Sequence, residues 1–131
     1  MKNLQEVLNQ FTAEDGTKLP YPIDAYAFLM DALHFTVSKF EKTRHVSGQE
    51  LLEGIRDYAL QEFGPMARTV FKYWKIHETL DFGKLVFALV EAGILRKQPE
   101  DKLEDFKDGY DFDKAFARPF DDFNQPAKTK R

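Results

Sequence analysis

The sequence of 131 residues contains no cysteine. This absence excludes disulfide bonds, thiolate metal ligands and a cysteine nucleophile. Small secreted domains usually depend on disulfides, so we expect the chain in a reducing compartment. Residues 1–6 lack the apolar stretch of a secretory signal, and no apolar run approaches the length of a membrane-spanning helix. The sequence therefore predicts a cytoplasmic protein.

Glycine and proline are scarce, with seven and six residues, and 43% of the chain is hydrophobic. This composition argues against a disordered chain and predicts one folded domain of common size. The 13 phenylalanines are expected to supply most of the core, because each ring removes a large area from water. The net charge of −3 argues against a dedicated nucleic-acid binder, whose affinity depends on phosphate contacts.

The spacing of apolar residues predicts a mainly α-helical domain. Ser47 and Glu50 have the spacing of a capping box, and Gly64 is placed to end the same helix. Thr79 is placed to cap a later helix, which Gly93 closes. The predicted helices cover residues 1–11, 22–42, 47–63, 65–74 and 79–92.

Two glycines, Gly54 and Gly83, fall inside these predicted helices. Glycine in a helix costs about 1 kcal/mol relative to alanine, so its presence asks for a reason. We expect another backbone or a large ring, such as that of Trp74, to pack closely against them.

The pattern changes after Gly93. Residues 94–97 and 109–113 are short segments that could pair as two strands, with a polar loop between them. Helices followed by a small C-terminal β-hairpin predict a winged-helix-like arrangement. One domain then covers residues 1–123: an N-terminal helix and connector (1–19), a helical core (20–93), and a hairpin with an aromatic tail (94–123). Residues 124–131 are predicted to be disordered.

Several stretches resemble a family of short bacterial proteins with no assigned function. They are residues 44–56 (RHVSGQELLEGIR), Phe63-Gly64-Pro65, Asp81-Phe82-Gly83 with residues 86–93, and the end from Gly109-Tyr110-Asp111-Phe112 to Phe120. The resemblance extends over most of the chain between about residues 20 and 120. It implies a bacterial protein with the fold of that family, and it implies no activity, cofactor or catalytic residue.

The sequence offers no metal-binding pattern. His34, His45 and His77 are far apart and lack metal-ligand spacing. An EF-hand alignment on Gly109 puts Phe106 and Ala115 where calcium needs oxygen ligands. We therefore predict no metal and no cofactor.

Catalytic motifs are missing in the same way. Ser38 and Ser47 lack a Gly-x-Ser-x-Gly surround, and no glycine-rich loop has the phosphate-binding pattern. We predict that the protein is not an enzyme. The weakest of the open alternatives is an enzyme whose site combines His45 or His77 with nearby carboxylates.

Residues 98–113 carry seven acidic residues against two lysines. The simplest interpretation is a solvated loop, and the functional one is a docking surface for a basic partner through Asp105 and Asp108. The tail phenylalanines have helical spacing and are expected to fold back onto the core, although Phe120 and Phe123 could instead insert into a partner or a second copy. These four residues are Phe112, Phe116, Phe120 and Phe123.

Arg68, Lys72 and Lys75 are spaced to share one helical face, with no acidic residue from 66 to 77. A solvated outer face is the simplest interpretation; the alternative is phosphate contact by a nucleic-acid or ribosome-associated protein. Our preferred hypothesis is a non-enzymatic binding module that acts through protein contacts, either with an unidentified partner or by self-association.

Overall fold

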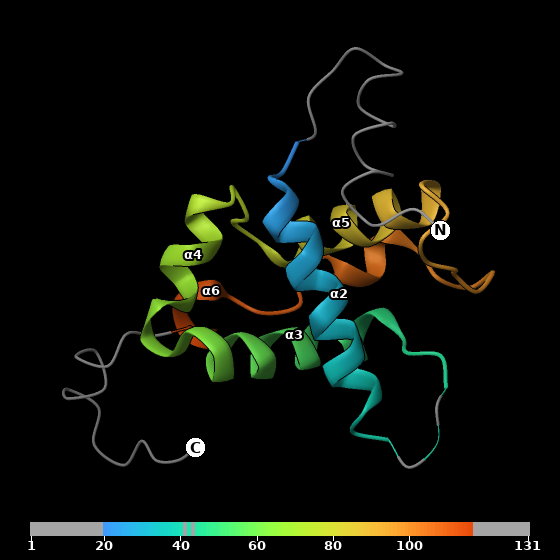
Figure 1. Cartoon of the computed structure of the whole chain (residues 1–131), viewed down its shortest axis with the longest axis horizontal. Coiled ribbons are helices and arrows are strands. Elements are labelled where there is room, and N and C mark those ends of the chain that lie inside the picture. Colours follow the sequence, from blue (N-terminus) through green and yellow to red (C-terminus); the bar gives the residue numbers. More distant parts are fainter. Residues whose placement is uncertain (1–19, 41, 43, 117–131) are drawn as a thin grey trace.

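The computed structural model describes residues 20–40, 42 and 44–116. These residues form a mainly helical structure, as predicted (Figure 1). Its α-helices are α2 (Ile23–Val37), α3 (Gly48–Phe63), α4 (Ala67–Tyr73), α5 (Thr79–Glu91) and α6 (Phe112–Ala115). Two 3₁₀ turns, η1 (Gly64–Met66) and η2 (Leu103–Phe106), complete the regular elements. The helix predicted over residues 1–11 and the predicted disordered end, 124–131, lie outside the described residues.

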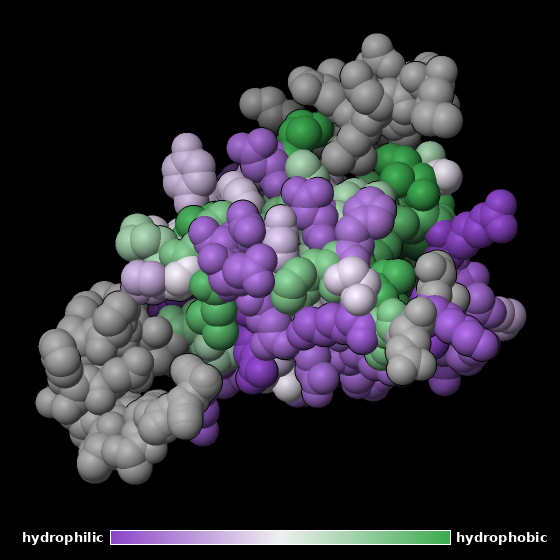
Figure 2. Space-filling view, turned by 60° about the horizontal axis from the view of Figure 1, so that its bottom comes forward, coloured by the Kyte–Doolittle hydropathy of each residue, from purple (hydrophilic) through white to green (hydrophobic). Residues whose placement is uncertain are grey.

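The capping box at the start of α3 is confirmed. The Ser47 hydroxyl accepts a hydrogen bond from the Glu50 amide at 3.1 Å, and the Glu50 carboxylate accepts one from the Ser47 amide at 3.0 Å. Gly64 follows α3 with a φ of 53°, the positive value that glycine adopts without strain. Exposed polar residues cover the outer face of α3, where Figure 2 shows hydrophilic atoms turned toward the viewer.

Helices α2 and α3 meet at Gly54. A Cβ atom at this position would lie 1.7 Å from Oγ1 of Thr36, which itself donates to the Ala32 carbonyl at 2.7 Å. The expected close approach is therefore present, although a threonine makes it and not Trp74. The absence of a side chain at Gly54 sets how closely the two longest described helices pack.

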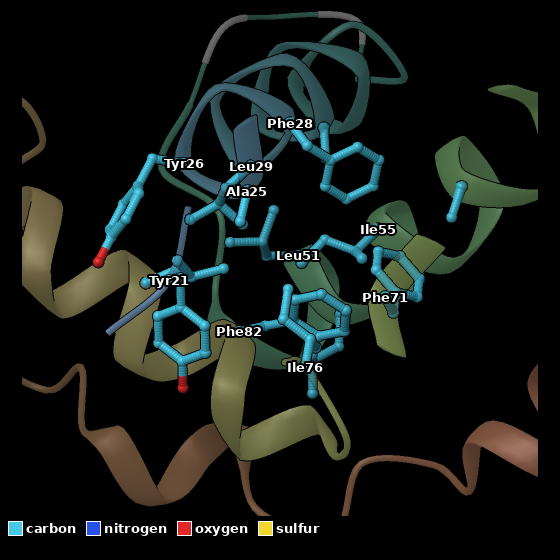
Figure 3. Packing of buried hydrophobic residues seen from close by; sticks show 14 of the residues in the cluster. Tyr21, Ala25, Tyr26, Phe28, Leu29, Leu51, Ile55, Phe71, Ile76 and Phe82 are labelled. Carbon is cyan, nitrogen blue, oxygen red and sulfur yellow. The ribbon is translucent and has the colours of Figure 1, made fainter. Parts of the chain in front are cut away.

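The core is a cluster of aromatic rings around Phe71. This side chain is fully buried, and Figure 3 shows it pointing in among residues of α2, α3 and α5. Its ring centroid lies 5.2 Å from that of Phe116 and 5.8 Å from that of Phe112. The other rings within 6.3 Å belong to Phe28, Phe63, Trp74 and Phe82. The prediction that the tail phenylalanines complete the core is confirmed for Phe112 and Phe116; Phe120 and Phe123 lie outside the described residues.

The start of α5 differs from the prediction. Glu78 occupies the N-cap position, and Thr79 is the first helical residue. Asp81 accepts hydrogen bonds from the backbone amides of His77 and Glu78, at 2.8 and 3.1 Å, and from the hydroxyl of Tyr21 at 2.6 Å. Burial, and then the bond to Asp81, raise the pKa of Tyr21.

Thr79 is buried and has another role. Its hydroxyl donates to the Phe106 carbonyl at 2.5 Å and accepts from the Gly109 amide at 2.9 Å. The ring of Phe106 packs against Gly83 of α5, where a Cβ atom would lie 2.8 Å from it. These contacts attach the segment after α5 back onto the start of that helix.

The predicted β-hairpin is wrong. Among the described residues no strand forms: residues 94–97 follow the turn at Gly93, and residues 109–111 lead into α6. The segment between them is held to the start of α5 by the buried ring of Phe106 and by the hydrogen bonds to Thr79. These contacts hold it in place without the pairing of two strands. A winged-helix arrangement, which requires that hairpin, is therefore absent from this part of the chain.

Within the described ranges, every helix is too short or too polar to cross a lipid bilayer.

Substitution of Gly54 tests the α2–α3 contact. Alanine is the better helix former by about 1 kcal/mol, but its Cβ atom would overlap Thr36. We expect Gly54→Ala to lower the free energy of unfolding by about 3 kcal/mol, as overpacking of a tight contact does. Urea denaturation followed by circular dichroism measures this. The control, Glu53→Ala at an exposed position of the same helix, is expected within about 0.5 kcal/mol of the parent. A stabilised Gly54→Ala protein would contradict the contact.

Candidate functional site

A surface pocket of about 180 Å³ opens between α2, the start of α3 and the second half of α5. Its wall is apolar, and a charged rim surrounds it. In Figure 2, hydrophobic atoms gather on the right-hand side of the molecule, with hydrophilic side chains beside them. The apolar wall consists of Leu33, Val37, Val46, Leu51, Val86, Phe87, Leu95 and Phe106. The charged and titratable residues of the rim are Arg44, His45, Arg96, Lys97, Asp101 and Asp105.

The size of this pocket restricts what it can hold. An apolar protein cavity of about 150 Å³ accommodates benzene, whereas sites for whole drug-sized molecules measure about 300 Å³ or more. The pocket therefore suits one aromatic ring or one branched aliphatic group. Its shape and chemistry match a single apolar side chain better than a large cofactor.

Arg44 is held in place on the rim. Its guanidinium contacts both carboxylate oxygens of Glu50, at 2.7 and 3.3 Å, and lies 3.8 Å from the ring centroid of Phe40. The bonds from Arg44 and from the Ser47 amide lower the pKa of Glu50 from 4.5 to about 2. The same glutamate thus serves the helix cap and positions a rim cation.

The carboxylates of the rim are engaged in local structure. Asp101 accepts from the amide of Gln98 at 2.8 Å and lies 2.8 Å from Nε2 of His45. Asp105 accepts from the amide of Lys102 at 3.1 Å. The pair of His45 and Asp101 joins the loop before α3 to the loop after α5.

Arg96 and Lys97 differ from the other charged rim residues. Neither forms an ion pair with a carboxylate of the described residues. Lys97 makes one long bond, 3.4 Å, to the carbonyl of Gln98. The charge that the described rim leaves open to a ligand is therefore cationic.

The structure separates the two aspartates predicted to form one docking surface. Asp105 is half-buried on the rim of the pocket. Asp108 is exposed, has a φ of 54°, and borders a different, shallow depression together with His77 and Tyr110. The other predicted partner contacts, Phe120 and Phe123, lie outside the described residues.

Arg68, Lys72 and Lys75 are all exposed, but they do not share one helical face. Helix α4 ends at Tyr73, and Lys75 follows it with a φ of 66°. Arg68 is paired with Asp113 at 2.7 Å, which offsets its charge. Tyr73, missed by the sequence analysis, is 84% exposed beside Lys72.

The arrangement contains little that could perform catalysis. Within the described part of the chain, no three His, Cys, Asp or Glu side chains lie close enough to hold a metal ion. His45 and Asp101 are within hydrogen-bonding reach of each other, but the pocket beside them is apolar. Ser47 also lines the pocket, yet its hydroxyl serves the helix cap, and no hydrogen bond joins it to His45 in the described structure. The absence of enzymatic activity stays a prediction.

Comparison of the chain with models of protein families, with curated proteins and with solved structures finds no match. The resemblance to short bacterial proteins consequently stays a prediction, and the geometry of the site carries the functional argument alone.

The sequence analysis did not recognise the pocket. Its wall combines residues from three α-helices, one 3₁₀ turn and two connecting segments, and no single motif contains them. One local signal was available: Val46 and Leu51, which flank the capping box, both line the pocket. Arg96 and Lys97 lie in residues 94–97, which were predicted to form a strand. Their position on the rim of the pocket was therefore not recognised.

The ion pair of Glu50 makes a pH-dependent prediction. Because its pKa is lowered in the folded protein, ionised Glu50 stabilises the fold above pH 4.5, and this contribution is lost as the pH falls toward 2. We expect Glu50→Gln to lower the free energy of unfolding at pH 7 by about 1 kcal/mol, because glutamine keeps the bond to the Ser47 amide but loses the negative charge beside Arg44 and at the helix N-terminus. The difference from the parent should shrink between pH 4.5 and pH 2.

Urea denaturation at several pH values measures this difference. Glu53→Gln, which removes an exposed carboxylate from the same helix, provides the control. A difference between parent and Glu50→Gln that stays constant down to pH 2 would count against the assigned pKa.

Proposed function

We propose that this chain is a non-enzymatic, cytoplasmic binding module that works through protein contacts. The observation that carries the proposal is the apolar pocket with its charged rim, which suits one apolar side chain of a partner protein. The lack of cysteine supports the cytoplasmic location.

The energetics of protein interfaces favour such a site. Full burial of one Leu- or Phe-sized side chain contributes about 2 kcal/mol. Interfaces concentrate their binding energy in a few side chains that fill desolvated pockets, while a polar rim excludes water around them. The wall around Val86 and Leu95 supplies the apolar contact, and the rim residues supply that surrounding ring.

A nucleic-acid-binding role is the second candidate, supported by the exposed ring of Tyr73 beside Lys72. Stacking of a base on an exposed aromatic ring contributes about 1–3 kcal/mol, and a neighbouring cation adds phosphate contact. Two observations weaken this candidate: the ion pair of Arg68 with Asp113 and the overall charge of −3.

A pocket-filling variant tests the proposed function. Val86 is half-buried and lines the pocket, so the phenyl ring of Val86→Phe is expected to occupy the space that a partner side chain needs. Tagged protein is incubated with native lysate with and without nuclease, and retained proteins are quantified by mass spectrometry. We expect specific partners to survive nuclease treatment and to fall at least tenfold with Val86→Phe.

The matched control is Val70→Phe, the same change at a half-buried position of α4 that does not line the pocket. It should retain the partners, and thermal denaturation should show that both variants are folded. Retention that is the same for Val86→Phe and the parent would overturn the proposal. Retention that disappears with nuclease and with Lys72→Glu, but not with Val86→Phe, would establish the nucleic-acid alternative.

A further inference from the structure

We infer that the pocket receives an aromatic side chain from the acidic segment Phe120-Asp121-Asp122-Phe123 of a second copy of this chain. This segment, called the tail motif below, lies outside the described residues. The inference rests on the proposed function, because it names the partner of the same pocket.

The first argument is size and chemical type. The pocket suits a single ring, and its wall includes the apolar side chains of Val37, Val86 and Leu95. The tail motif contains two phenylalanines, and either ring is of the size that the pocket accepts.

The second argument is charge. Arg96 and Lys97 on the rim have no carboxylate partner among the described residues, whereas the rim aspartates are engaged with backbone amides. In the tail motif, two aspartates separate the phenylalanines, so a ring in the pocket brings carboxylates to the rim. Complementary charges of this kind select an acidic segment over a neutral one, and salt weakens them.

The third argument is position, and it points to a second copy. Phe116 is buried in the aromatic core, and Phe120 follows four residues later, a span of about 14 Å at most. Figure 1 shows α6, where the described chain ends, at the opposite end of the molecule from the end of α5. Helix α3, which runs along the molecule from the pocket at its Gly48 end, is about 24 Å long. Phe120 therefore meets the pocket of another copy more readily than its own. Phe123 is seven residues from Phe116, a span of about 25 Å at most, so it would cover the length of α3 only as a fully extended chain. Reciprocal exchange between two copies closes a symmetric dimer.

Binding of a peptide tests this inference directly. A fluorescently labelled peptide of residues 117–125 is titrated into the full chain carrying Phe120→Ala and Phe123→Ala, which removes the competing rings. We expect saturable binding by anisotropy, a loss of at least tenfold in affinity with Val86→Phe, and no loss with Val70→Phe. Arg96→Glu with Lys97→Glu should weaken binding, and so should added salt.

Sedimentation equilibrium tests the same contact in the whole protein. The parent chain is expected to dimerise with rising concentration, and the Phe120→Ala/Phe123→Ala chain to stay monomeric with an unchanged circular dichroism spectrum. If that double variant fails to fold, Asp121→Lys with Asp122→Lys replaces it in both experiments, because these changes keep the rings and reverse the charge. The chain with Asp121→Lys and Asp122→Lys is still expected to bind the labelled peptide, and it is expected to lose its self-association.

The outcomes separate the two proposals. A peptide that does not bind, or that binds Val86→Phe as tightly as the parent pocket, overturns the inference about the tail motif. If Val86→Phe still releases lysate partners in that case, the proposed function stands with a different partner. If Val86→Phe changes neither peptide binding nor lysate partners, both proposals are wrong.

Discussion

The hydroxyl of Thr79 is the contact on which much of this structure depends. It donates to the Phe106 carbonyl and accepts from the Gly109 amide, and both groups belong to the segment after α5. Because Thr79 opens α5 and the segment follows its end, the two bonds join residues 27 and 30 positions apart in the sequence. Gly83 leaves room for Phe106 beside them. Without this attachment, the wall and rim residues contributed by residues 95–106 would not meet α2 and α3, and the pocket would not exist.

The same attachment explains the electrostatics of the rim. Asp101 and Asp105 accept hydrogen bonds from backbone amides of their own turns, as loop aspartates commonly do. These two carboxylates thus stabilise their own turns. Arg96 and Lys97 precede the turns, and neither forms an ion pair with a carboxylate of the described residues. Arg96 and Lys97, which directly precede a region of the sequence with an acidic excess, thus place cations at the apolar pocket. Net charge alone would have suggested the opposite kind of partner.

The capping box at Ser47 and Glu50 was predictable because every group in it lies within four residues of the others. The strand predicted over residues 109–113 was wrong because its alternating pattern has another cause: Phe112 joins the ring cluster around Phe71, and the hydroxyl of Tyr110 donates to the Leu52 carbonyl at 2.9 Å. Thr79 was assigned to the wrong task, since its true partners are 27 and 30 residues away.

The sequence by itself determined the helical class, the start and end of α3 and the abundance of rings in the core, because these follow from spacing and composition over short distances. It also indicated that Gly54 and Gly83 meet close neighbours, since glycine in a helix needs a reason. Only the tertiary structure decided that those neighbours are Thr36 and Phe106, that Asp105 and Asp108 face different hollows, and that a pocket forms beside Arg96 and Lys97. Such features depend on how segments far apart in the sequence pack against each other. The fit of side chains across such contacts is not encoded in any local pattern of residues.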